Sequence, residues 1–419
     1  MIEWVDTELK DLKSFDIKKI YNSCRGCSGQ KLTNFFNIKN LPMPEGHVQA
    51  EEEEYAQDLS VFVCTDCFLV QTQEDLDLDQ YYKNYVYTPG ISFYSDEFMK
   101  LTANKLIETG YISRNSKILE IGSGDGTQLM HFLNRGISVT GVEPSSHLVK
   151  LSRSRGVNTV EAMFDDALAQ RFIRNQQKFD AILIQYTFDH LTDPGLFLKN
   201  AKDLLTPEGI LLIEVHDFEK ILSRNEACLF THEHSIYPSK DSITNLIEYH
   251  GLKVIEYDFL PEKVSRGNSM TVIAAQEEAR KPKSVLSLGD GIRRLRALET
   301  YNNFAQNISA AHLKLRKYLE NARYEGKRVA GYGAAGRGVD TCVLADINSD
   351  LLISIYDKNT LFHRKLTPVS RIPVKDPKDL YDDCPDEVIV FSYGYIDEIH
   401  DFYSDFHGKI ISMLDVMGG

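Results

Sequence analysis

The stretch Lys117-Ile-Leu-Glu-Ile-Gly-Ser-Gly-Asp-Gly-Thr127 sets the architecture of the chain, because an apolar strand runs there into a glycine-rich loop ahead of a helical pattern. Glycines lack a Cβ, so the backbone can turn sharply and lie close to a ligand. Two carboxylates, Glu120 and Asp125, stand beside the loop and would repel a pyrophosphate. The loop therefore predicts a ligand with cationic and hydroxyl groups, such as S-adenosylmethionine. Its glycines are Gly122, Gly124 and Gly126.

A second strand pattern, Gly136-Ile-Ser-Val-Thr-Gly-Val-Glu-Pro144, ends in an acid. Glu143 lies about 20 residues beyond the glycine loop, the spacing at which such folds bind the ribose hydroxyls of a cofactor. The combined pattern, E-x-G-x-G-x-G and then V-E-P-S, resembles motifs I and II of class I methyltransferases. Glycine motifs are degenerate, so a Rossmann-type NAD site is the alternative interpretation.

Strand-like and helical patterns alternate after the glycine loop and predict a doubly wound α/β domain. Ligands of such a sheet bind beyond the carboxyl ends of its strands. Besides the glycine loop and Glu143, this rule selects the Ala162-Met-Phe164 loop and the span from Gln185 to His190. Phe164 either stacks on an adenine or packs in the core. The seven predicted strands are Lys117–Ile121, Ser138–Glu143, Thr159–Ala162, Phe179–Gln185, Ile210–Val215, Leu252–Asp258 and Met270–Ala274.

The length and charge of the chain bound its class. At 419 residues it exceeds what one hydrophobic core usually supports, which predicts two or three domains. A net charge of −14 argues against binding to nucleic acid or a membrane surface, because phosphate binding needs clustered basic residues. The N-terminus has no signal-peptide pattern, and no apolar stretch approaches the length of a membrane span. We therefore expect a cytoplasmic protein without nucleic-acid, membrane or obligate protein partners.

Four of the seven cysteines form two C-x-x-C pairs, Cys24-Arg-Gly-Cys27 and Cys64-Thr-Asp-Cys67, separated by one long segment. Tetrahedral zinc takes four thiolates brought together in this way. Because four sulfurs fill the coordination sphere and leave no place for water, the pattern predicts one structural Zn2+. A redox-active cysteine pair is the alternative, although such a motif normally stands alone.

An aromatic segment, Tyr81-Tyr-Lys-Asn-Tyr-Val-Tyr87, follows the second cysteine pair and precedes an amphipathic helical pattern at about 92–109. Aromatic side chains at such a junction either pack between domains or line a substrate pocket. From the residues alone both interpretations stay open.

A charged stretch with a proline at 276–287 predicts a linker and a domain boundary. Apolar residues then keep near-helical spacing from Leu288. This spacing predicts a long helix, with a candidate break around Tyr301-Asn-Asn303, that leads into the last domain.

The last domain contains a second glycine motif. Lys327-Arg-Val-Ala-Gly-Tyr-Gly-Ala-Ala-Gly336 reads as strand, G-x-G-x-x-G and helix, and Asp357 follows the next predicted strand, at 352–356. Read alone, this is a dinucleotide fingerprint, which favours an NAD(P)-dependent oxidoreductase. Arg337 and Arg364 add positive charge nearby, which equally suits the pyrophosphate of a nucleotide-linked substrate.

Between the fifth and sixth strands, Leu229-Phe-Thr-His-Glu-His-Ser-Ile-Tyr237 places a carboxylate between two imidazoles. Histidine titrates near neutrality, so it can remove a proton from a carbon that an adjacent carbonyl makes acidic. Glu233 could hold the imidazole in one tautomer or bind a hydroxyl. The spacing lacks the i, i+4 pattern of two metal ligands on a helix, which leaves metal binding and structural hydrogen bonding as alternatives. His190, after the fourth strand, lies where the sheet rule puts catalytic groups.

The chain as a whole resembles the sugar C-methyltransferases that act on nucleotide-linked 4-keto-deoxysugars. Members have an N-terminal four-cysteine zinc domain, a central S-adenosylmethionine domain and a C-terminal Rossmann-like domain, and this order matches the chain from end to end. The resemblance implies a zinc-binding domain at 1–80, a methyltransferase domain at 81–280 and a Rossmann-like domain at 281–419 that contributes to substrate binding.

The resemblance also implies roles for single residues. The Y-H-E-H motif of the family corresponds to Thr231-His-Glu-His234, which makes His234 the base and Glu233 a sugar-contacting residue, and His190 matches the histidine after the fourth strand. Its glycine loop falls on Gly331 to Gly338. Its tyrosine-rich segment falls on Tyr82, Tyr85 and Tyr87. Zinc ligation falls on Cys24, Cys27, Cys64 and Cys67. Cofactor binding falls on Gly122, Gly124 and Glu143.

Three departures from the family pattern concern the substrate. Thr231 replaces the usual Tyr, Arg266-Gly-Asn-Ser-Met stands where the family tends to have H-G-G-S-L, and Arg337 replaces Lys. We therefore count Thr231, Asn268 and Arg337 among the substrate-binding candidates. The expected reaction is methyl transfer from S-adenosylmethionine to C3 of a nucleotide-linked 4-keto-deoxysugar. The alternatives are the oxidoreductase and a zinc-stabilised scaffold with vestigial sites.

Overall fold

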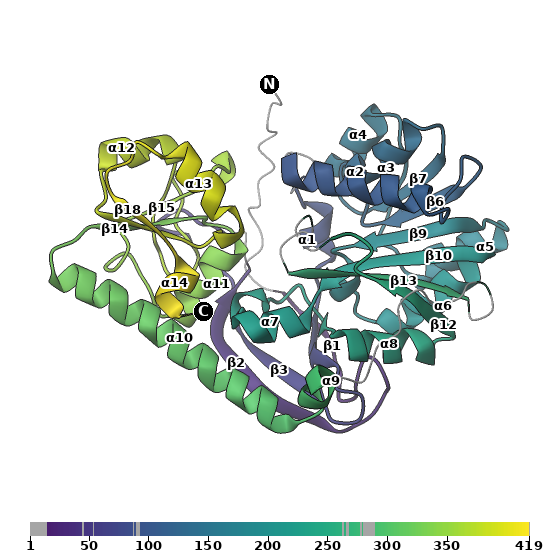
Figure 1. The fold of residues 1–419 in the computed structure, drawn as a ribbon, viewed down its shortest axis with the longest axis horizontal. Coiled ribbons are helices and arrows are strands. Elements are labelled where there is room, and N and C mark those ends of the chain that lie inside the picture. The colour runs from purple at the N-terminus through teal and green to yellow at the C-terminus, as the bar shows by residue number, and fades with distance from the viewer. Residues whose placement is uncertain are drawn as a thin grey trace.

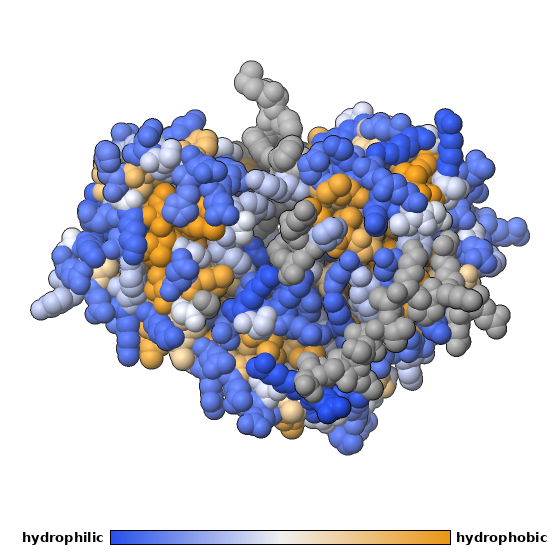
Figure 2. Space-filling model, viewed as in Figure 1, coloured by the Kyte–Doolittle hydropathy of each residue, from blue (hydrophilic) through white to orange (hydrophobic). Residues whose placement is uncertain are grey.

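The computed structural model describes residues 15–43, 46–52, 54–86, 88, 93–261, 264, 268–276, 279 and 290–418. Two α/β lobes lie above and on either side of a smaller antiparallel sheet (Figure 1). Hydrophilic side chains cover most of the face seen in Figure 2, with smaller hydrophobic areas on each lobe. Among these residues, no helix is both long and apolar enough to cross a membrane.

A seven-stranded sheet forms the central lobe, in the order β12-β13-β10-β9-β6-β7-β8. The five strands from β10 to β8 are parallel, and β13 runs antiparallel between β10 and β12. The seven strands predicted from the sequence are confirmed, although β10 begins five residues earlier than predicted. Their bounds are β6 Lys117–Ile121, β7 Ser138–Glu143, β8 Asn158–Glu161, β9 Phe179–Gln185, β10 Leu205–His216, β12 Leu252–Tyr257 and β13 Ser269–Gln276.

Helices cover both faces of this sheet (Figure 1). Apolar side chains of α2 and α3 pack on one face, and those of α5, α6 and α8 pack on the other. Side chains of Ser145, Asp165, Asp193 and Ser239 accept hydrogen bonds from the first-turn amides of α4, α5, α6 and α8, so these helices begin where the sequence supplies a cap. The helices are α2 Phe93–Glu108, α3 Thr127–Leu133, α4 Ser146–Ser154, α5 Asp166–Arg174, α6 Pro194–Leu204, α7 Phe218–Arg224 and α8 Lys240–Tyr249, with 3-10 turns η2 Phe188–His190 and η3 Ala227–Leu229.

The antiparallel sheet contains a strand from the central part of the chain. Its order is β11-β4-β3-β2, and β11 comes from the stretch that follows His234. This pairing fixes the histidine loop on the N-terminal sheet. The elements are β1 Ile17–Ile20, β2 Leu32–Pro42, β3 Ala56–Cys64, β4 Val70–Thr72, β5 Glu74–Leu76, α1 Asp79–Lys83 and β11 Ile236–Tyr237, and β1 pairs with β5 in a separate two-stranded sheet.

The C-terminal lobe is a five-stranded parallel sheet in the order β16-β15-β14-β17-β18, as a Rossmann-like fold requires. Its strands are β14 Val329–Tyr332, β15 Ile355–Tyr356, β16 Val374–Lys375, β17 Glu387–Val390 and β18 Lys409–Ser412. Its helices are α11 Gly336–Leu344, α12 Leu380–Asp383, α13 Ile396–Phe402 and α14 Met413–Met417, with turns η5 Thr360–Phe362, η6 Pro377–Asp379 and η7 Tyr393–Tyr395.

The long helix breaks at a different place from the predicted one. Helix α9 (Asp290–Leu295) ends before Ala297, whose backbone is extended, and α10 (Leu298–Tyr324) then continues through the predicted break at 301–303. Arg296 at the junction donates two hydrogen bonds to the carboxylate of Asp241, at 2.9 and 2.8 Å. Tyr301 lies in the core instead, with its ring 5.3 Å from that of Phe35. The tertiary contact at Arg296, which has no local sequence signal, sets the junction.

Candidate cofactor and active site

The loop after β6 has the backbone that its glycines predict. All three glycines have positive φ, 68° at Gly122, 51° at Gly124 and 79° at Gly126. A Cβ at Gly122 would lie 2.4 Å from Thr187 Oγ1, and one at Gly126 would lie 2.5 Å from Ser152 Oγ. A Cβ at Gly124 would meet no protein atom within 4 Å. Gly124 therefore faces open space, as a loop that receives a ligand should.

Glu143 holds the glycine loop from the end of β7. Its Oε2 accepts the Gly124 N–H at 2.9 Å and its Oε1 accepts the Ser145 N–H at 2.8 Å. Burial raises the pKa of this carboxyl to about 7, although both amides act in the opposite direction. Glu120, near the end of β6, is also buried. Both acids stand where the sequence put them, at the carboxyl ends of neighbouring strands.

Asp125 differs from the expectation that it faces the ligand. Its Oδ1 accepts hydrogen bonds from Thr127 N–H and Oγ1–H, at 3.1 and 2.7 Å. Its Oδ2 pairs with Arg155 at 3.0 Å. The side chain therefore organises the first turn of α3 and binds within the protein.

The two other cofactor candidates lie at the same edge of the sheet. Gln185 ends β9 and donates from Nε2 to Oε2 of Glu214 on β10, at 2.9 Å. Phe164 is half-buried, with its ring edge-to-face against that of Phe197 at 5.6 Å. The ring of Phe164 thus packs on one side and remains partly accessible on the other, so stacking on adenine stays a prediction.

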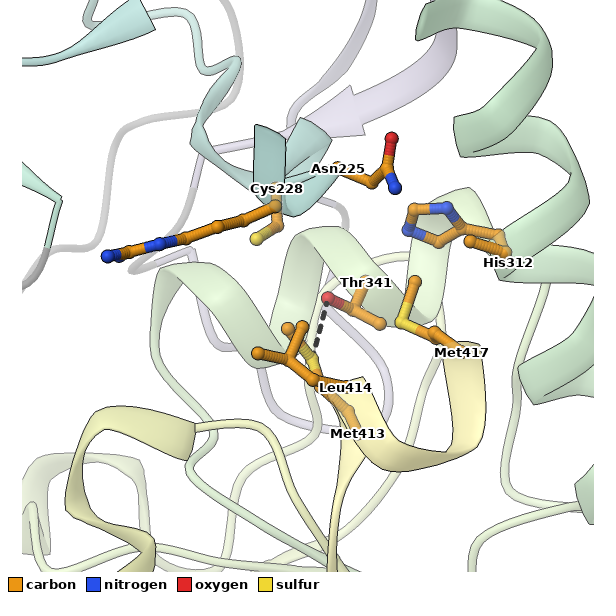
Figure 3. Close-up of a pocket in the computed structure, with 9 residues that line it drawn as sticks. Asn225, Cys228, His312, Thr341, Met413, Leu414 and Met417 are labelled. Carbon is orange, nitrogen blue, oxygen red and sulfur yellow. Dashed lines mark hydrogen bonds between the residues drawn. The ribbon is translucent and has the colours of Figure 1, made fainter. Parts of the chain in front are cut away.

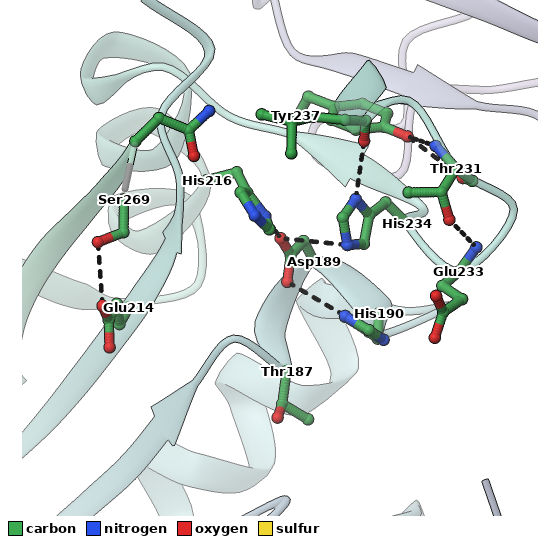
Figure 4. A network of polar contacts seen from close by, with 12 residues as sticks. Thr187, Asp189, His190, Glu214, His216, Thr231, Glu233, His234, Tyr237 and Ser269 are labelled. Atoms are coloured by element: carbon green, nitrogen blue, oxygen red, sulfur yellow. Dashed lines mark hydrogen bonds and ion pairs between the residues drawn. The ribbon is translucent and has the colours of Figure 1, made fainter. Parts of the chain in front are cut away.

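Three histidines converge on one buried carboxylate (Figure 4). Asp189, in η2 after β9, accepts a hydrogen bond from His216 Nδ1 at 2.6 Å, and His216 ends β10. The Nε2 atoms of His190 and His234 lie 3.9 and 4.0 Å from oxygens of the same carboxylate. Sequence reasoning assigned roles to His190 and His234, included Asp189 only as part of the span from Gln185 to His190, and missed His216. The sheet rule applied to the end of β10 would have selected His216.

The tautomer of His234 follows from its second nitrogen. Nδ1 lies 3.1 Å from the carbonyl oxygen of Leu229, which can only accept, so Nδ1 carries the hydrogen. Burial lowers the pKa of His234 to about 3, and Asp189 acts in the opposite direction. Burial also lowers the pKa of His190. Asp189 is buried too, yet the three histidines hold its pKa below the usual range. The resting site therefore holds an ionised Asp189 carboxylate beside the neutral imidazoles of His190 and His234.

The tyrosine-rich segment reaches this cluster. The hydroxyl of Tyr82 lies 2.9 Å from His190 Nδ1. The rings of Tyr81, Tyr82 and Tyr85 contact one another at 5.4 to 6.3 Å, and the backbone carbonyl of Tyr85 accepts a hydrogen bond from Ser145 beside the cofactor loop. Tyr87 lies outside the described residues. Tyr82 and Tyr85 thus pack at the junction after the N-terminal region and also lie next to the histidine cluster and the cofactor loop.

The loop that carries His234 is rigidly held. Tyr237 on β11 accepts the Thr231 N–H at 3.0 Å, and Thr231 Oγ1 accepts the Glu233 N–H at 3.1 Å. Thr231 is buried, whereas Glu233 is half-buried. The hydrogen bond to the Thr231 hydroxyl therefore fixes the backbone of the loop at Glu233.

Polar residues from both lobes meet at Glu226, which sequence reasoning also missed. Asn268 Nδ2 donates to its Oε2 at 2.7 Å, and the Tyr393 hydroxyl donates to its Oε1. Arg337 stacks over the ring of Tyr393, 5.1 Å from its centre. Burial raises the pKa of Glu226, and Arg337 acts in the opposite direction. Asn268 and Arg337, predicted from separate motifs, are thus joined through two residues. Of the departure at 266–270, positions 266 and 267 lie outside the described residues.

The second glycine loop is contacted by side chains of the protein itself. Asp357 accepts the Ala334 N–H at 2.7 Å, and His47 of the N-terminal region contacts the Ala334 carbonyl at 3.0 Å. A Cβ at Gly338 would lie 2.0 Å from the Gly333 carbonyl oxygen, so the glycine there serves packing of α11 on the loop. The acid of the fingerprint therefore binds the loop itself. Arg364 is exposed, and its N–H donates to Val374.

The four cysteines of the two C-x-x-C pairs converge. Their sulfurs all lie within 4.8 Å of one another, with Cys24 to Cys67 at 3.5 Å and Cys27 to Cys64 at 3.7 Å. Tetrahedral zinc with Zn–S bonds of about 2.3 Å separates its sulfurs by about 3.8 Å. The cysteines are free thiols, and the Gly26 N–H donates to Cys24 Sγ at 3.3 Å. The donor set and its spacing fit a closed, structural zinc site.

A small cavity between the lobes is not the substrate site. It is about 10 Å3 in volume, enough for roughly one water. Cys228, His312, Thr341 and Met417 are among its lining residues (Figure 3). It is too small to admit a sugar.

Three family models match successive parts of the chain. They are described as a putative zinc binding domain at residues 24–82, a methyltransferase domain at 93–257 and a C-methyltransferase C-terminal domain at 265–414. The chain is also similar to C-methyltransferase NovU of Streptomyces niveus, with 25% identity over 399 residues that cover 93% of this chain and 94% of that protein.

Other similarities cover only part of the chain. The ubiquinone biosynthesis O-methyltransferase of Dinoroseobacter shibae is 25% identical over 151 residues, which cover 33% of this chain and 61% of that enzyme. The solved structure of an S-adenosylmethionine-dependent methyltransferase from Clostridium acetobutylicum covers 45% of this chain and 93% of its own, with 13% identity and a TM-score of 0.35. A TM-score of this size carries no further conclusion.

The matched catalytic models and the named relatives all describe methyl transfer, so the oxidoreductase alternative finds no support. The cofactors are S-adenosylmethionine and a structural zinc. The chain therefore belongs to the S-adenosylmethionine-dependent C-methyltransferases that carry an N-terminal zinc-binding domain.

Proposed function

We propose that this C-methyltransferase acts on a nucleotide-linked 4-keto-deoxysugar and methylates it at C3. The observation that carries the proposal is the position of His234. Its ring lies 4.9 Å from those of His190 and His216, which follow β9 and β10. Strand β9 is the direct neighbour of β6, which carries the cofactor loop. A base therefore stands at the ligand-binding edge of the sheet.

His234 acts as the base through Nε2, because Nδ1 is held by the Leu229 carbonyl. A 4-keto group makes the C3–H bond acidic, Nε2 takes the proton, and the electron pair of that bond becomes the enolate. S-adenosylmethionine, when bound, supplies an electrophilic methyl group that the enolate carbon attacks. His190, hydrogen-bonded with Tyr82, is suited to contact the ketone oxygen. Glu120, Gly122, Gly124, Gly126, Glu143, Phe164 and Gln185 would hold the cofactor.

The remaining candidates would bind the sugar nucleotide. Arg337 offers a planar cation that could bind a diphosphate. It stacks on Tyr393, and Tyr393 and Asn268 both donate hydrogen bonds to Glu226, so Asn268 belongs to the same group of contacts. Glu233 is suited to a sugar hydroxyl, and Thr231, which fixes its backbone, acts through it. Tyr82, Tyr85 and Tyr87 would border the sugar from the N-terminal side.

The wider assignments stay proposals. Seven free cysteines, four of them in one cluster, suit the reducing conditions of the cytoplasm. The division into zinc-binding, methyltransferase and Rossmann-like domains at 1–80, 81–280 and 281–419 follows the three main sheets, with β11 as the strand that crosses from the second to the first. The ligands of the zinc would be Cys24, Cys27, Cys64 and Cys67.

The test is incubation of the purified protein with S-adenosylmethionine and a panel of nucleotide-linked keto-deoxysugars. Mass spectrometry should find one product heavier by a methyl group, and NMR should place that group at C3. The expected result includes loss of deuterium from substrate labelled at C3. Methylation on an oxygen, or no product from any 4-keto sugar, would contradict the proposal.

A further inference from the structure

The carboxylate of Asp189 has an unusual environment. It is fully buried, and only Oδ2 accepts a hydrogen bond, from His216 Nδ1 at 2.6 Å. Oδ1 accepts none among the described residues. The Nε2 atoms of His190 and His234 face this carboxylate from 3.9 and 4.0 Å, too far for a direct hydrogen bond. A buried, partly unsatisfied anion is costly, so its retention needs an explanation.

The tautomer of His234 shows which protonation state of its ring the Asp189 carboxylate favours. His234 carries its hydrogen on Nδ1, so in the neutral ring the Nε2 lone pair faces an anion and gains nothing from it. Once Nε2 takes a proton, the same geometry sets an imidazolium beside an ionised carboxylate. His216 donates to the carboxylate from the carboxyl end of the neighbouring strand, β10, and fixes its direction. The arrangement thus favours the protonated form of His234, the form that exists only after proton transfer.

We propose that Asp189, oriented by His216, is a positioning residue that makes His234 basic enough to deprotonate the substrate. This inference rests on the proposed function. The proton moves from the substrate carbon to His234 Nε2, and the C–H electron pair becomes the enolate. Asp189 stays ionised and takes no proton. After methyl transfer the proton leaves His234 for solvent, and the carboxylate is ready for the next turnover.

Other charged and titratable groups also surround His234. From η2 come Asp189 and His190, from β10 comes His216, and β11 places Tyr237 with its ring 5.7 Å away. Glu233 precedes it in the same loop. Burial lowers the pKa values of His190 and His234, and burial raises that of Tyr237, so these groups are neutral in the resting site. Asp189 is the anion that faces His234 Nε2.

The experiment measures proton transfer apart from methyl transfer. S-adenosylhomocysteine replaces the methyl donor, and loss of deuterium from a C3-labelled 4-keto sugar nucleotide is followed against pH. Asp189→Asn keeps the shape and removes the charge. It should slow exchange at least about 100-fold, the range expected for an impaired general base, while KM changes less than about threefold. The acidic limb of kcat/KM should move to lower pH by about one unit or more.

Two further variants separate this role from a structural one. Asp189→Glu should recover part of the exchange rate, and His216→Asn should shift the pH profile in the same direction as Asp189→Asn by a smaller amount. Asp193→Asn is the matched control. Asp193 caps α6 a few residues after Asp189, and because Asn can also cap a helix, this variant should leave the pH profile of exchange unchanged. Unchanged S-adenosylhomocysteine affinity confirms that each variant is folded.

Three outcomes would overturn the proposal. If Asp189→Asn exchanged deuterium at the wild-type rate and with the wild-type pH profile, Asp189 would have no such role. Two metal equivalents in the wild type and one in Asp189→Asn would identify Asp189, with His190 and His234, as a metal site. A wild-type protein that exchanges no deuterium from any 4-keto sugar would remove the base chemistry itself, which distinguishes failure of the proposed function from failure of this inference.

Discussion

Single residues define the chemistry of this site through burial. His234 is 6% exposed and Asp189 is fully buried, so each charge that forms there is poorly screened by water. A neutral imidazole with one fixed tautomer and a nearby anion is the state from which a proton can be accepted. The same burial makes the effect of substitution at these positions large and specific.

The base is tested by His234→Gln. We expect turnover to fall about 10²- to 10⁴-fold, because general base catalysis contributes that much, with little change in S-adenosylhomocysteine affinity. His232→Gln, two residues earlier in the loop, is the control, because His232 Nε2 lies 2.9 Å from the Leu41 carbonyl oxygen on β2. Initial rates and calorimetric binding check both. Near-normal turnover of His234→Gln would remove His234 as the base.

Glu143 should make cofactor binding depend on pH. Its pKa is raised to about 7 by burial, so the carboxylate that we propose accepts hydrogen bonds from the ribose hydroxyls becomes fully ionised only above neutrality. We expect affinity for S-adenosylhomocysteine to increase as the pH rises from 6 to 8. Glu143→Gln should bind more weakly, by about tenfold, because a charge-assisted hydrogen bond is lost, and its affinity should be flat over that range. Calorimetric titrations at several pH values decide this, and parallel slopes for the two proteins would contradict it.

Elements carry the next level of organisation, and β11 is the informative one. It joins the sheet of the zinc-binding region while the preceding loop holds His234. The Thr72 hydroxyl, on β4, donates to the His234 carbonyl at 3.3 Å. Distortion of the N-terminal sheet would therefore displace His234 directly.

Loss of zinc should separate cofactor binding from catalysis. Cys64→Ser removes one of four thiolates, so we expect metal loss, reduced solubility and local unfolding of the N-terminal sheet. The soluble fraction should still bind S-adenosylhomocysteine, since the glycine loop lies on a different sheet, while turnover falls with the disordered β11. Elemental analysis should give one zinc per chain in the wild type. A metal-free protein that stayed fully folded and regained turnover when zinc was added would instead indicate Lewis-acid chemistry.

The strands of the central lobe, and β14 and β15 of the C-terminal lobe, could be predicted because each is an apolar run that ends at a turn signal. The cluster of Cys24, Cys27, Cys64 and Cys67 could be predicted because the spacing within each C-x-x-C pair is a local signal. Asp189 and His216 lie where the sheet rule puts functional groups, but their pairing and the contacts of Glu226 could not be predicted, because these partners come together only when distant strand ends meet. Asp125 was assigned to the ligand because its pairing with Arg155 has no sequence signal. The break at Arg296 was misplaced for the same reason, since Asp241 supplies it from another helix.

At the scale of the whole molecule, buried histidines should make stability depend on acid. His312 on α10 is buried, and burial lowers its pKa although the Ile308 carbonyl acts in the opposite direction. The unfolded chain binds a proton at this position below about pH 6.5, whereas the folded protein does not, so the contribution of His312 to stability falls as the pH drops.

The variant His312→Gln separates the contribution of His312 to the pH dependence of stability from the contributions of the Asp and Glu carboxylates. We expect it to be less stable than the wild type at pH 7.5 and to lose this difference, or reverse it, at pH 5. Urea midpoints at both pH values measure the comparison. A difference between the two proteins that stays constant with pH would show that His312 is protonated to the same extent in the folded and unfolded chains.

Helix α10 has a mechanical consequence. Its first half, with Tyr301, Phe304 and Ile308, packs into the core shared with the zinc-binding sheet, and its second half, with Leu315 and Leu319, packs into the C-terminal lobe. Twenty-seven residues without glycine or proline form a rigid helix about 40 Å long. The parts of the protein that pack on its two ends should therefore move as one body. We expect the zinc-binding sheet and the C-terminal lobe to keep a fixed orientation relative to each other when substrate binds.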